Sequence, residues 1–205
     1  MMGLIGRKVG MTQLFDESGE LVPLTVIESG PCYVLQVKTL ERDGYSAVQL
    51  GFDPVKSGRL TKPLLGHFEK AHVPPMRILQ EVRVDRVETY NVGQQIGVGI
   101  FKKGDLVSIT GKSKGRGFAG VVKRHGFRGG SKTHGQSDRW RAPGSIGASS
   151  FPSRVWKNLK MAGRMGGTTV TVKNLKVWDI DVEKHLLIVK GAVPGHRNGY
   201  LFVRK

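Results

Sequence analysis

The chain has 205 residues, and its 33 Lys and Arg outnumber 16 Asp and Glu, which gives a formal net charge of +17. Such an excess opposes compaction and indicates a polyanionic partner, most commonly nucleic acid, with a merely soluble basic protein as the alternative. The single cysteine, Cys32, excludes an internal disulfide and a cysteine-cluster metal site. With no secretory signal, no apolar run of 18 residues and no basic amphipathic helix, we expect a cytoplasmic, reduced protein without membrane contact.

Residues 1–110 are expected to be mostly β-structure. In "YSAVQLGF", the alternation of Val48, Leu50 and Phe52 is typical of a strand with one buried face. One helix is predicted at 63–71, because the two prolines of the following "HVPP" forbid its continuation. Apolar, β-branched runs predict strands at 21–28, 33–39, 45–52, 76–84, 94–101 and 105–110. Within 94–101, Gly97 and Gly99 indicate a bend or a close backbone approach rather than a flat strand.

Residues 111–167 have a different composition. They hold 13 Lys and Arg, the single acid Asp138 and 13 of the 29 glycines. Such a segment buries too little apolar surface to offset the entropy of ordering itself. It nevertheless contains five large aromatic residues, which flexible linkers seldom do. We therefore predict a basic extension that leaves the β-core, folds against an external surface and returns. The aromatic residues are Phe118, Phe127, Trp140, Phe151 and Trp156.

Residues 168–205 return to β character, with strands predicted at 168–182, 186–193 and 200–203. Short strands about ten residues apart favour a small closed barrel over alternating β–α–β units. The expected organisation is thus a discontinuous β-barrel core, 1–110 with 168–205, interrupted by the 111–167 extension.

The stretch "GRGFAG" matches the G-x-G-x-x-G dinucleotide fingerprint at Gly115, Gly117 and Gly120. A strand precedes it, and "FAGVVKRHG" can form two helical turns. The second strand and its acidic residue about 20 positions later are missing. A cofactor is therefore not expected, nor is a small-molecule substrate.

Catalysis and metal binding are also disfavoured. A triad can be drawn from Ser131, Asp138 and either His125 or His134, but the surroundings are basic and glycine-rich, with no apolar pocket to shape a site. No pair of histidines has the metal-ligand spacing H-x-x-x-H.

Binding of RNA makes use of more of these residues. Lys112, Lys114 and Arg116, at alternate positions, would lie along one side of an extended segment and could follow a phosphate backbone. Trp140 stands between Arg139 and Arg141, an arrangement suited to stacking on unpaired bases. Packing of the extension on itself is the competing explanation for each tryptophan.

A second tryptophan has the same kind of setting, since Trp156 stands between Arg154 and Lys157. Lys123 and Arg124 follow the apolar pair Val121 and Val122 in the predicted short helix. These groups extend the basic character over the whole segment.

Several motifs, in order along nearly the whole chain, resemble the bacterial ribosomal protein L-three family of the large subunit. They are "GLIGRKVGMTQLF", "DGYSAVQLGF", "KPLLGHFEKA", "TGKSKGRGFAGVVKRHGF", "PGSIG", "KMAGRMGG" and "LLIVKGAVPG". The resemblance implies a mainly β fold: a six-stranded translation-protein-type β-barrel with a long, basic, largely irregular inserted extension and one or two short helices.

The same resemblance implies a structural protein that performs no chemistry. It would bind large-subunit rRNA near its 3′ end, act early in subunit assembly and extend a basic arm toward the peptidyl transferase region. Large-subunit proteins of the L-fourteen and L-nineteen families would be its neighbours in the cytoplasmic ribosome.

The resemblance and the local pattern together predict the rRNA-binding residues. His134 and Trp140 fall where the family's finger tip approaches RNA. Some members carry a methylated Gln after "GSIG", but Ala148 stands there in this chain. The predicted contacts are Lys112, Lys114, Arg116, Lys123, Arg124, Arg128, Lys132, His134, Arg139, Trp140, Arg141, Arg154, Trp156, Lys157, Lys160 and Arg164.

Two other functions stay open from the residues alone. One is an enzyme that uses a nucleotide or acts on RNA, with "GRGFAG" or His134 at its site. The other is a freestanding nucleic-acid chaperone, which would not prefer one rRNA domain over a random RNA of equal length.

Overall fold

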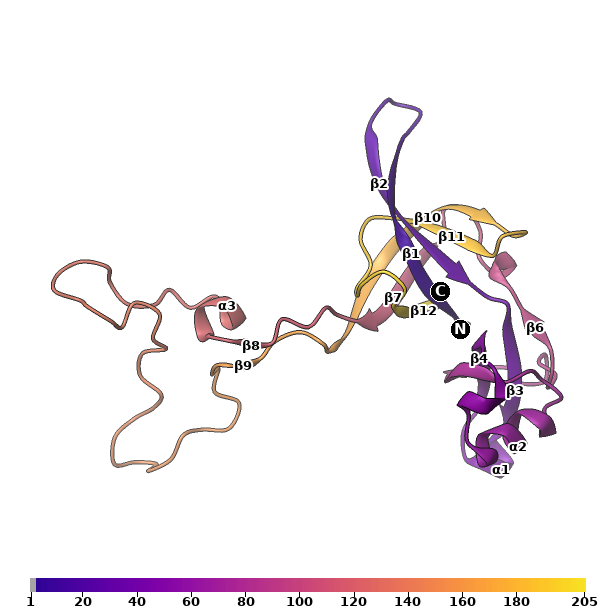
Figure 1. The fold of residues 1–205 in the computed structure, drawn as a ribbon, viewed down its shortest axis with the longest axis horizontal. Helices are drawn as coiled ribbons and strands as arrows, with labels where there is room; N and C mark the ends of the chain where they lie inside the picture. Colours follow the sequence, from indigo (N-terminus) through magenta and orange to yellow (C-terminus); the bar gives the residue numbers. More distant parts are fainter. Residues whose placement is uncertain (1–2) are drawn as a thin grey trace. The chain divides into compact units, whose positions relative to one another are not determined.

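The structure is a computed structural model that describes residues 3–205 (Figure 1). The chain forms two compact units. The first, here called the barrel unit, runs up to Ser113 and resumes at Thr169–Lys205, and the second, here called the arm, is Lys114–Thr168. Within the described residues, no helix is long and apolar enough to cross a membrane.

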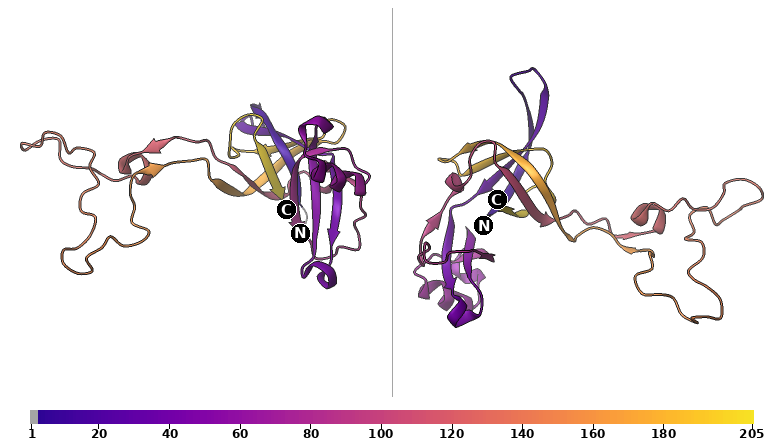
Figure 2. Two further views of the ribbon diagram at one scale, coloured as in Figure 1. Left: turned by 60° about the horizontal axis from the view of Figure 1, so that its bottom comes forward. Right: turned by 180° about the vertical axis from the view of Figure 1, so that it is seen from behind.

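A closed antiparallel barrel of six strands, in the order β1-β12-β7-β10-β11-β2, forms the centre of the barrel unit (Figure 2). The expected six-stranded barrel is therefore confirmed. Its strands are β1 (Gly3–Phe15), β2 (Leu21–Ser29), β7 (Leu106–Lys112), β10 (Thr169–Asp181), β11 (Leu186–Lys190) and β12 (Tyr200–Arg204).

Strand β1 was not among the predicted strands, yet it closes the barrel. Its inner half pairs with the C-terminal strand β12, from Gly3 opposite Arg204 to Arg7 opposite Tyr200. On its other side it pairs with β2 through Phe15 opposite Leu21, with one irregularity near Gly10. The interior of the barrel is filled by fully buried aliphatic side chains, as in small barrels generally. They include Leu4, Ile27, Ile109, Val177, Leu187 and Val203.

A second antiparallel sheet, in the order β5-β4-β3-β6, stands beside the barrel in the same unit. The sequence pattern does not distinguish these strands from those of the barrel. Val48, Leu50 and Phe52 are buried on one face of β4, as predicted, and join the barrel core. In the segment 94–101 only two residues form a strand and a 3-10 turn follows, so the expected bend at Gly97 and Gly99 is confirmed, whereas strand structure over the rest of the segment is not. The elements are β3 (Cys32–Lys38), β4 (Ala47–Pro54), β5 (Met76–Arg83), β6 (Gln95–Ile96) and η2 (Val98–Ile100).

The predicted helix at 63–71 is confirmed as α2 (Lys62–Lys70), and its Phe68 packs in a small second core with Leu35 and Met76. Two further short elements lie in this region, α1 (Leu40–Asp43) and η1 (Ser57–Arg59). Proline at the first turn suits the helix start, where its missing N–H is not needed.

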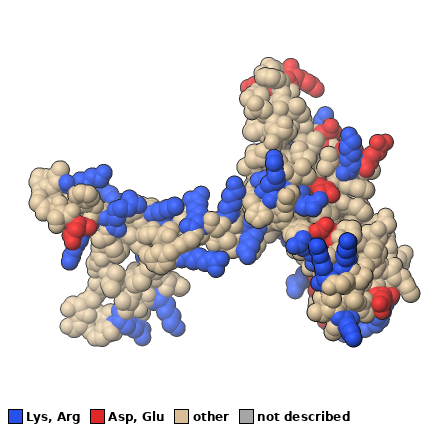
Figure 3. All heavy atoms as spheres, viewed as in Figure 1, with Lys and Arg blue, Asp and Glu red and all other residues tan. Residues whose placement is uncertain are grey.

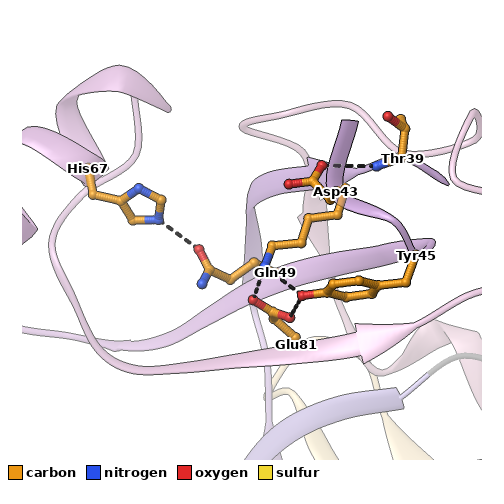
Figure 4. Close-up of polar contacts among 7 residues, drawn as sticks. Thr39, Asp43, Tyr45, Gln49, His67 and Glu81 are labelled. Atoms are coloured by element: carbon orange, nitrogen blue, oxygen red, sulfur yellow. Dashed lines mark hydrogen bonds and ion pairs between the residues drawn. The ribbon is translucent and has the colours of Figure 1, made fainter. Parts of the chain in front are cut away.

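Polar contacts tie the outer face of this sheet together (Figure 4). Lys38 Nζ lies 2.6 Å from a Glu81 carboxylate oxygen, and the Tyr45 hydroxyl donates to the other oxygen at 2.7 Å. The hydrogen bond with Lys38 is the main cause that lowers the pKa of Glu81. Nearby, the His67 ring shares a 2.7 Å hydrogen bond with the Gln49 side chain.

Candidate nucleic-acid interface

The arm has almost no hydrophobic core. All of its residues are described, and only Ala119 and Val121 among them are buried. Its regular elements are β8 (Phe118–Ala119), α3 (Val121–His125) and β9 (Gly163–Arg164). The arm carries 12 Lys and Arg with the single acid Asp138, and Lys and Arg are spread over its surface (Figure 3). Burial of its own apolar surface therefore cannot account for its order.

A short ribbon joins the two ends of the arm at its base. Phe118 pairs with Arg164 in the β8–β9 ladder. Backbone hydrogen bonds continue it, from Arg116 N to Met165 O at 2.8 Å and from Met165 N to Gly117 O at 2.9 Å. Gly166 follows with φ of +70°, and a Cβ there would overlap the carbonyl oxygen of Lys114. The sequence places glycine where the two segments of the ribbon must pass this closely.

Helix α3 is held against the returning chain by its own side chains. Arg124 Nη1 donates to the Met161 carbonyl at 2.7 Å, and His125 Nε2 lies 3.0 Å from the same oxygen. Arg124 is half-buried, unlike the other predicted contact residues. Its guanidinium thus has a structural partner within the arm, which leaves fewer of its donors for RNA.

The remaining predicted residues are exposed and come from two units. Lys112 ends strand β7 of the barrel unit, whereas the others belong to the arm. The ion pairs found among the described residues all lie in the barrel unit, so the charge of the exposed arm cations is available to an external anion. These cations are Lys114, Arg116, Lys123, Arg128, Lys132, Arg139, Arg141, Arg154, Lys157, Lys160 and Arg164.

The two tryptophans are about half exposed and each has a local contact. The Arg154 guanidinium lies 5.0 Å from the centre of the Trp156 ring, a cation–π distance. Trp140 Nε1 donates to the Gln136 carbonyl at 3.4 Å. His134 is exposed and has a left-handed backbone, with φ of 58°. Both tryptophan side chains therefore stay accessible for stacking, and Trp156 already carries a cation beside it.

Two other aromatic side chains were absent from the predicted contacts. Phe118 is 81% exposed and Phe151 is 84% exposed, the highest values among the large apolar side chains of the chain's described part. Ile146, Leu159 and Met161 are also exposed. Aromatic residues without helix or strand periodicity in a basic segment were the signal that could have identified them.

One loop of the arm surrounds an open hollow with a volume of about 720 Å³. Phe127 and the guanidinium-bearing Arg128 and Arg139 line it, with glycines that bring the backbone close. Gly130 N donates to the Trp140 carbonyl at 2.9 Å and closes the neck of the loop. An open, glycine-rich hollow with two cations suits a phosphate group or an extruded base.

The competing sites do not assemble. After "GRGFAG", a five-residue helix leads into irregular chain, and β8 pairs with β9 in antiparallel fashion, so no β–α–β unit forms. His125 contacts the Met161 carbonyl, and the Ser131 hydroxyl contacts Thr133 rather than a histidine. In residues 3–205, no three His, Cys, Asp or Glu side chains are grouped as metal ligands.

Comparisons with known proteins agree on one family. The model of "Ribosomal protein L3" matches residues 80–185. A "Large ribosomal subunit protein uL3" from Herpetosiphon aurantiacus is 56% identical over 99% of this chain and 95% of its own length. Proteins of the same name from Syntrophus aciditrophicus and Chloroherpeton thalassium are 54% and 55% identical over 98% of this chain, and over 92% and 97% of their own lengths.

Proposed function

Because the chain belongs to the ribosomal protein L3 family, we propose that it is a structural component of the large subunit of the cytoplasmic ribosome and binds large-subunit rRNA through its arm. The family is structural and non-enzymatic. The observation that carries the proposal is the arm itself: 12 cations and one acid on 55 residues that bury two side chains.

Electrostatics and stacking support RNA rather than another polyanion. Eleven of the arm's cations are exposed, and the accessible aromatic faces of Phe118, Trp140, Phe151 and Trp156 are interspersed among them. Exposed π-faces beside cations suit unpaired bases, which single-stranded rRNA loops and bulges display. A simple polyanion would use the charges and leave the aromatic rings without a partner.

Further parts of the proposal concern position and partners. The barrel unit serves as the mount, and the arm extends into rRNA toward the peptidyl transferase region. Early binding of the arm would assist subunit assembly, since rRNA that folds around it has its phosphate repulsion neutralised. Proteins of the L-fourteen and L-nineteen families are the proposed protein neighbours.

Replacing the arm by a tight turn tests the proposal. Lys112 on β7 lies opposite Thr169 on β10, so an Asn-Gly pair in place of 113–168 can close a two-residue hairpin without disturbing the barrel. Large-subunit rRNA affinity would be measured against salt for the full chain and for this variant, with random RNA of equal length as the competitor.

If all eleven exposed cations meet phosphates, they add about 8 to the log–log salt slope, at ~0.7 for each phosphate of unpaired RNA. The variant should unfold as cooperatively as the full chain and lose most of that slope. Equal affinity and slope in the variant would assign RNA binding to the barrel unit. Equal affinity of the full chain for random RNA would favour a chaperone.

A further inference from the structure

The outer half of the β1–β2 hairpin is an unpartnered ribbon. Among residues 3–205, β1 pairs with β12 only over Gly3–Arg7, and β2 pairs with β11 only over Leu24–Glu28. Backbone hydrogen bonds continue for one more residue on each strand, from Lys8 N to Gly199 O at 3.0 Å and from Gly191 N to Pro23 O at 2.8 Å. Farther out the two strands pair with each other alone and project from the barrel (Figure 1). Both backbone edges of this ribbon are open, a feature that proteins usually blunt with lysine, proline or a cover.

One face of the ribbon is apolar and exposed. Met11 and Phe15 are four residues apart on β1, so their side chains lie on the same face of the strand. Leu21 of β2 is directly opposite Phe15, which puts its side chain on this face as well. Phe15 is 73% exposed, and Met11 and Leu21 are each 51% exposed. Pro23, opposite Gln13 on that face, is also exposed. Contiguous exposed apolar groups of this kind mark interaction surfaces.

The charge of the hairpin is opposite to that of the chain. Residues 9–27 contain no Lys or Arg and three acids, Asp16, Glu17 and Glu20, in a protein with net charge +17. The acids stand at the hairpin tip, at the top of Figure 3. Lys103 and Lys176 of the barrel unit line a hollow beside residues 15–18, but the ribbon itself adds only negative charge. Its own charge therefore disfavours phosphates, and RNA is a poorer occupant for the ribbon than a basic protein.

The tip is held in one conformation. The Asp16 carboxylate accepts hydrogen bonds from Ser18 N at 3.0 Å, Ser18 Oγ at 2.6 Å and Glu20 N at 2.9 Å. These bonds, with the Ser18 hydroxyl foremost, lower the pKa of Asp16 and keep it ionised. Glu17 and Glu20 project from a fixed turn, which presents a preformed acidic end beside the apolar face.

We propose that the apolar face and acidic tip of the β1–β2 hairpin dock a basic protein of the large subunit, which contributes apolar side chains to Met11, Phe15 and Leu21 and cations to Glu17 and Glu20. The inference rests on the proposed function, because the subunit supplies the partner. A second copy of this chain would bring another acidic tip to the same surface and is disfavoured by like-charge repulsion.

Site-specific photo-crosslinking in assembled large subunits tests this. Benzoylphenylalanine replaces Phe15 in one full-length chain, and Phe118 in a second chain as the arm control. Each is expressed in cells, and the large subunits are isolated by sedimentation before irradiation. Position 15 should give an adduct that resists ribonuclease, is lost on proteolysis and contains a basic protein of the subunit. Position 118 should give an adduct to rRNA.

Charge reversal tests the acidic tip separately from the turn. The double variant Glu17→Lys with Glu20→Lys leaves the Asp16 hydrogen bonds intact and should lower the yield of the position-15 adduct by about tenfold. The double variant Glu17→Gln with Glu20→Gln should lower this yield by less. It provides the test if the lysine variant fails to assemble into subunits. A control probe at Leu40, which is similarly exposed, should be insensitive to both changes.

The outcomes separate the two proposals. An rRNA adduct at position 15, an adduct to a second copy, no adduct within assembled subunits, or an adduct insensitive to both charge changes overturns the hairpin inference while the proposed function stands. If the chain is absent from large subunits, or position 118 gives no rRNA adduct, the proposed function fails first.

Discussion

The base of the arm depends on a glycine that alanine cannot replace. At Gly166, φ is +70° and a Cβ would overlap the Lys114 carbonyl oxygen, which belongs to the opposite segment of the ribbon. We therefore expect Gly166→Ala to open the ribbon between Arg116 and Met165. Gly126 is the matched control, because its φ of +73° is similar and a Cβ at that position would meet no atom within 4 Å.

We expect the two substitutions to destabilise the arm by different amounts. A left-handed backbone costs alanine about 1–2 kcal/mol at either position. At Gly166 the displaced segment also loses two backbone hydrogen bonds, from Arg116 N to Met165 O and from Met165 N to Gly117 O, at about 1 kcal/mol each. The expected total is about 3–4 kcal/mol at Gly166 against about 1–2 kcal/mol at Gly126, a difference of about 2 kcal/mol or roughly 30-fold in the opening equilibrium.

Amide hydrogen exchange reads this opening directly. The amides of Arg116 and Met165 donate in the ribbon, so Gly166→Ala should speed their exchange about 30-fold more than Gly126→Ala does. The thermal midpoint of the barrel unit should be the same in both variants, and rRNA affinity should fall more for Gly166→Ala. Equal exchange rates of these amides in the two variants would refute the close approach of the two ribbon segments at Gly166.

Three further predictions concern the barrel unit. Leu24→Ala should lower the free energy of unfolding by about 2–5 kcal/mol in denaturant titration, since Leu24 is fully buried; a loss below about 1 kcal/mol would contradict the packing. Glu81→Gln should reduce acid sensitivity. The lowered pKa of Glu81 means that its contribution to stability is present above the unfolded-state pKa and is lost as pH falls through the folded-state pKa. Stability curves from about pH 7 to pH 3 should therefore be flatter in the variant, by less than about 1 kcal/mol because the pair is partly exposed; identical curves would argue against the Lys38 contact. Burial raises the pKa of the Cys32 thiol to about 12, so thiol reagents should modify it only at the rate of unfolding, and fast labelling of folded protein would contradict its burial.

Features with a local cause could be predicted from the sequence. Helix α2 was found because two prolines follow it and forbid its continuation, and the face of β4 was found from its alternating pattern. The basic segment was visible because charge and glycine content are properties of the chain itself and need no fold. The motif resemblance supplied the six-stranded barrel and the family, which the fold and the comparisons confirm.

Features that depend on distant partners appeared only in the tertiary structure. Strand β1 closes the barrel against β12, nearly the whole chain away, and no local pattern encodes which strand a given strand will pair with. The same limit hid the division into barrel and second sheet, and the bond that ties Arg124 to Met161. The hairpin tip shows the limit most clearly: its acids and apolar residues are plain in the sequence, but only the register places Phe15 and Leu21 on one exposed face, because exposure is decided by which strands run out of partners.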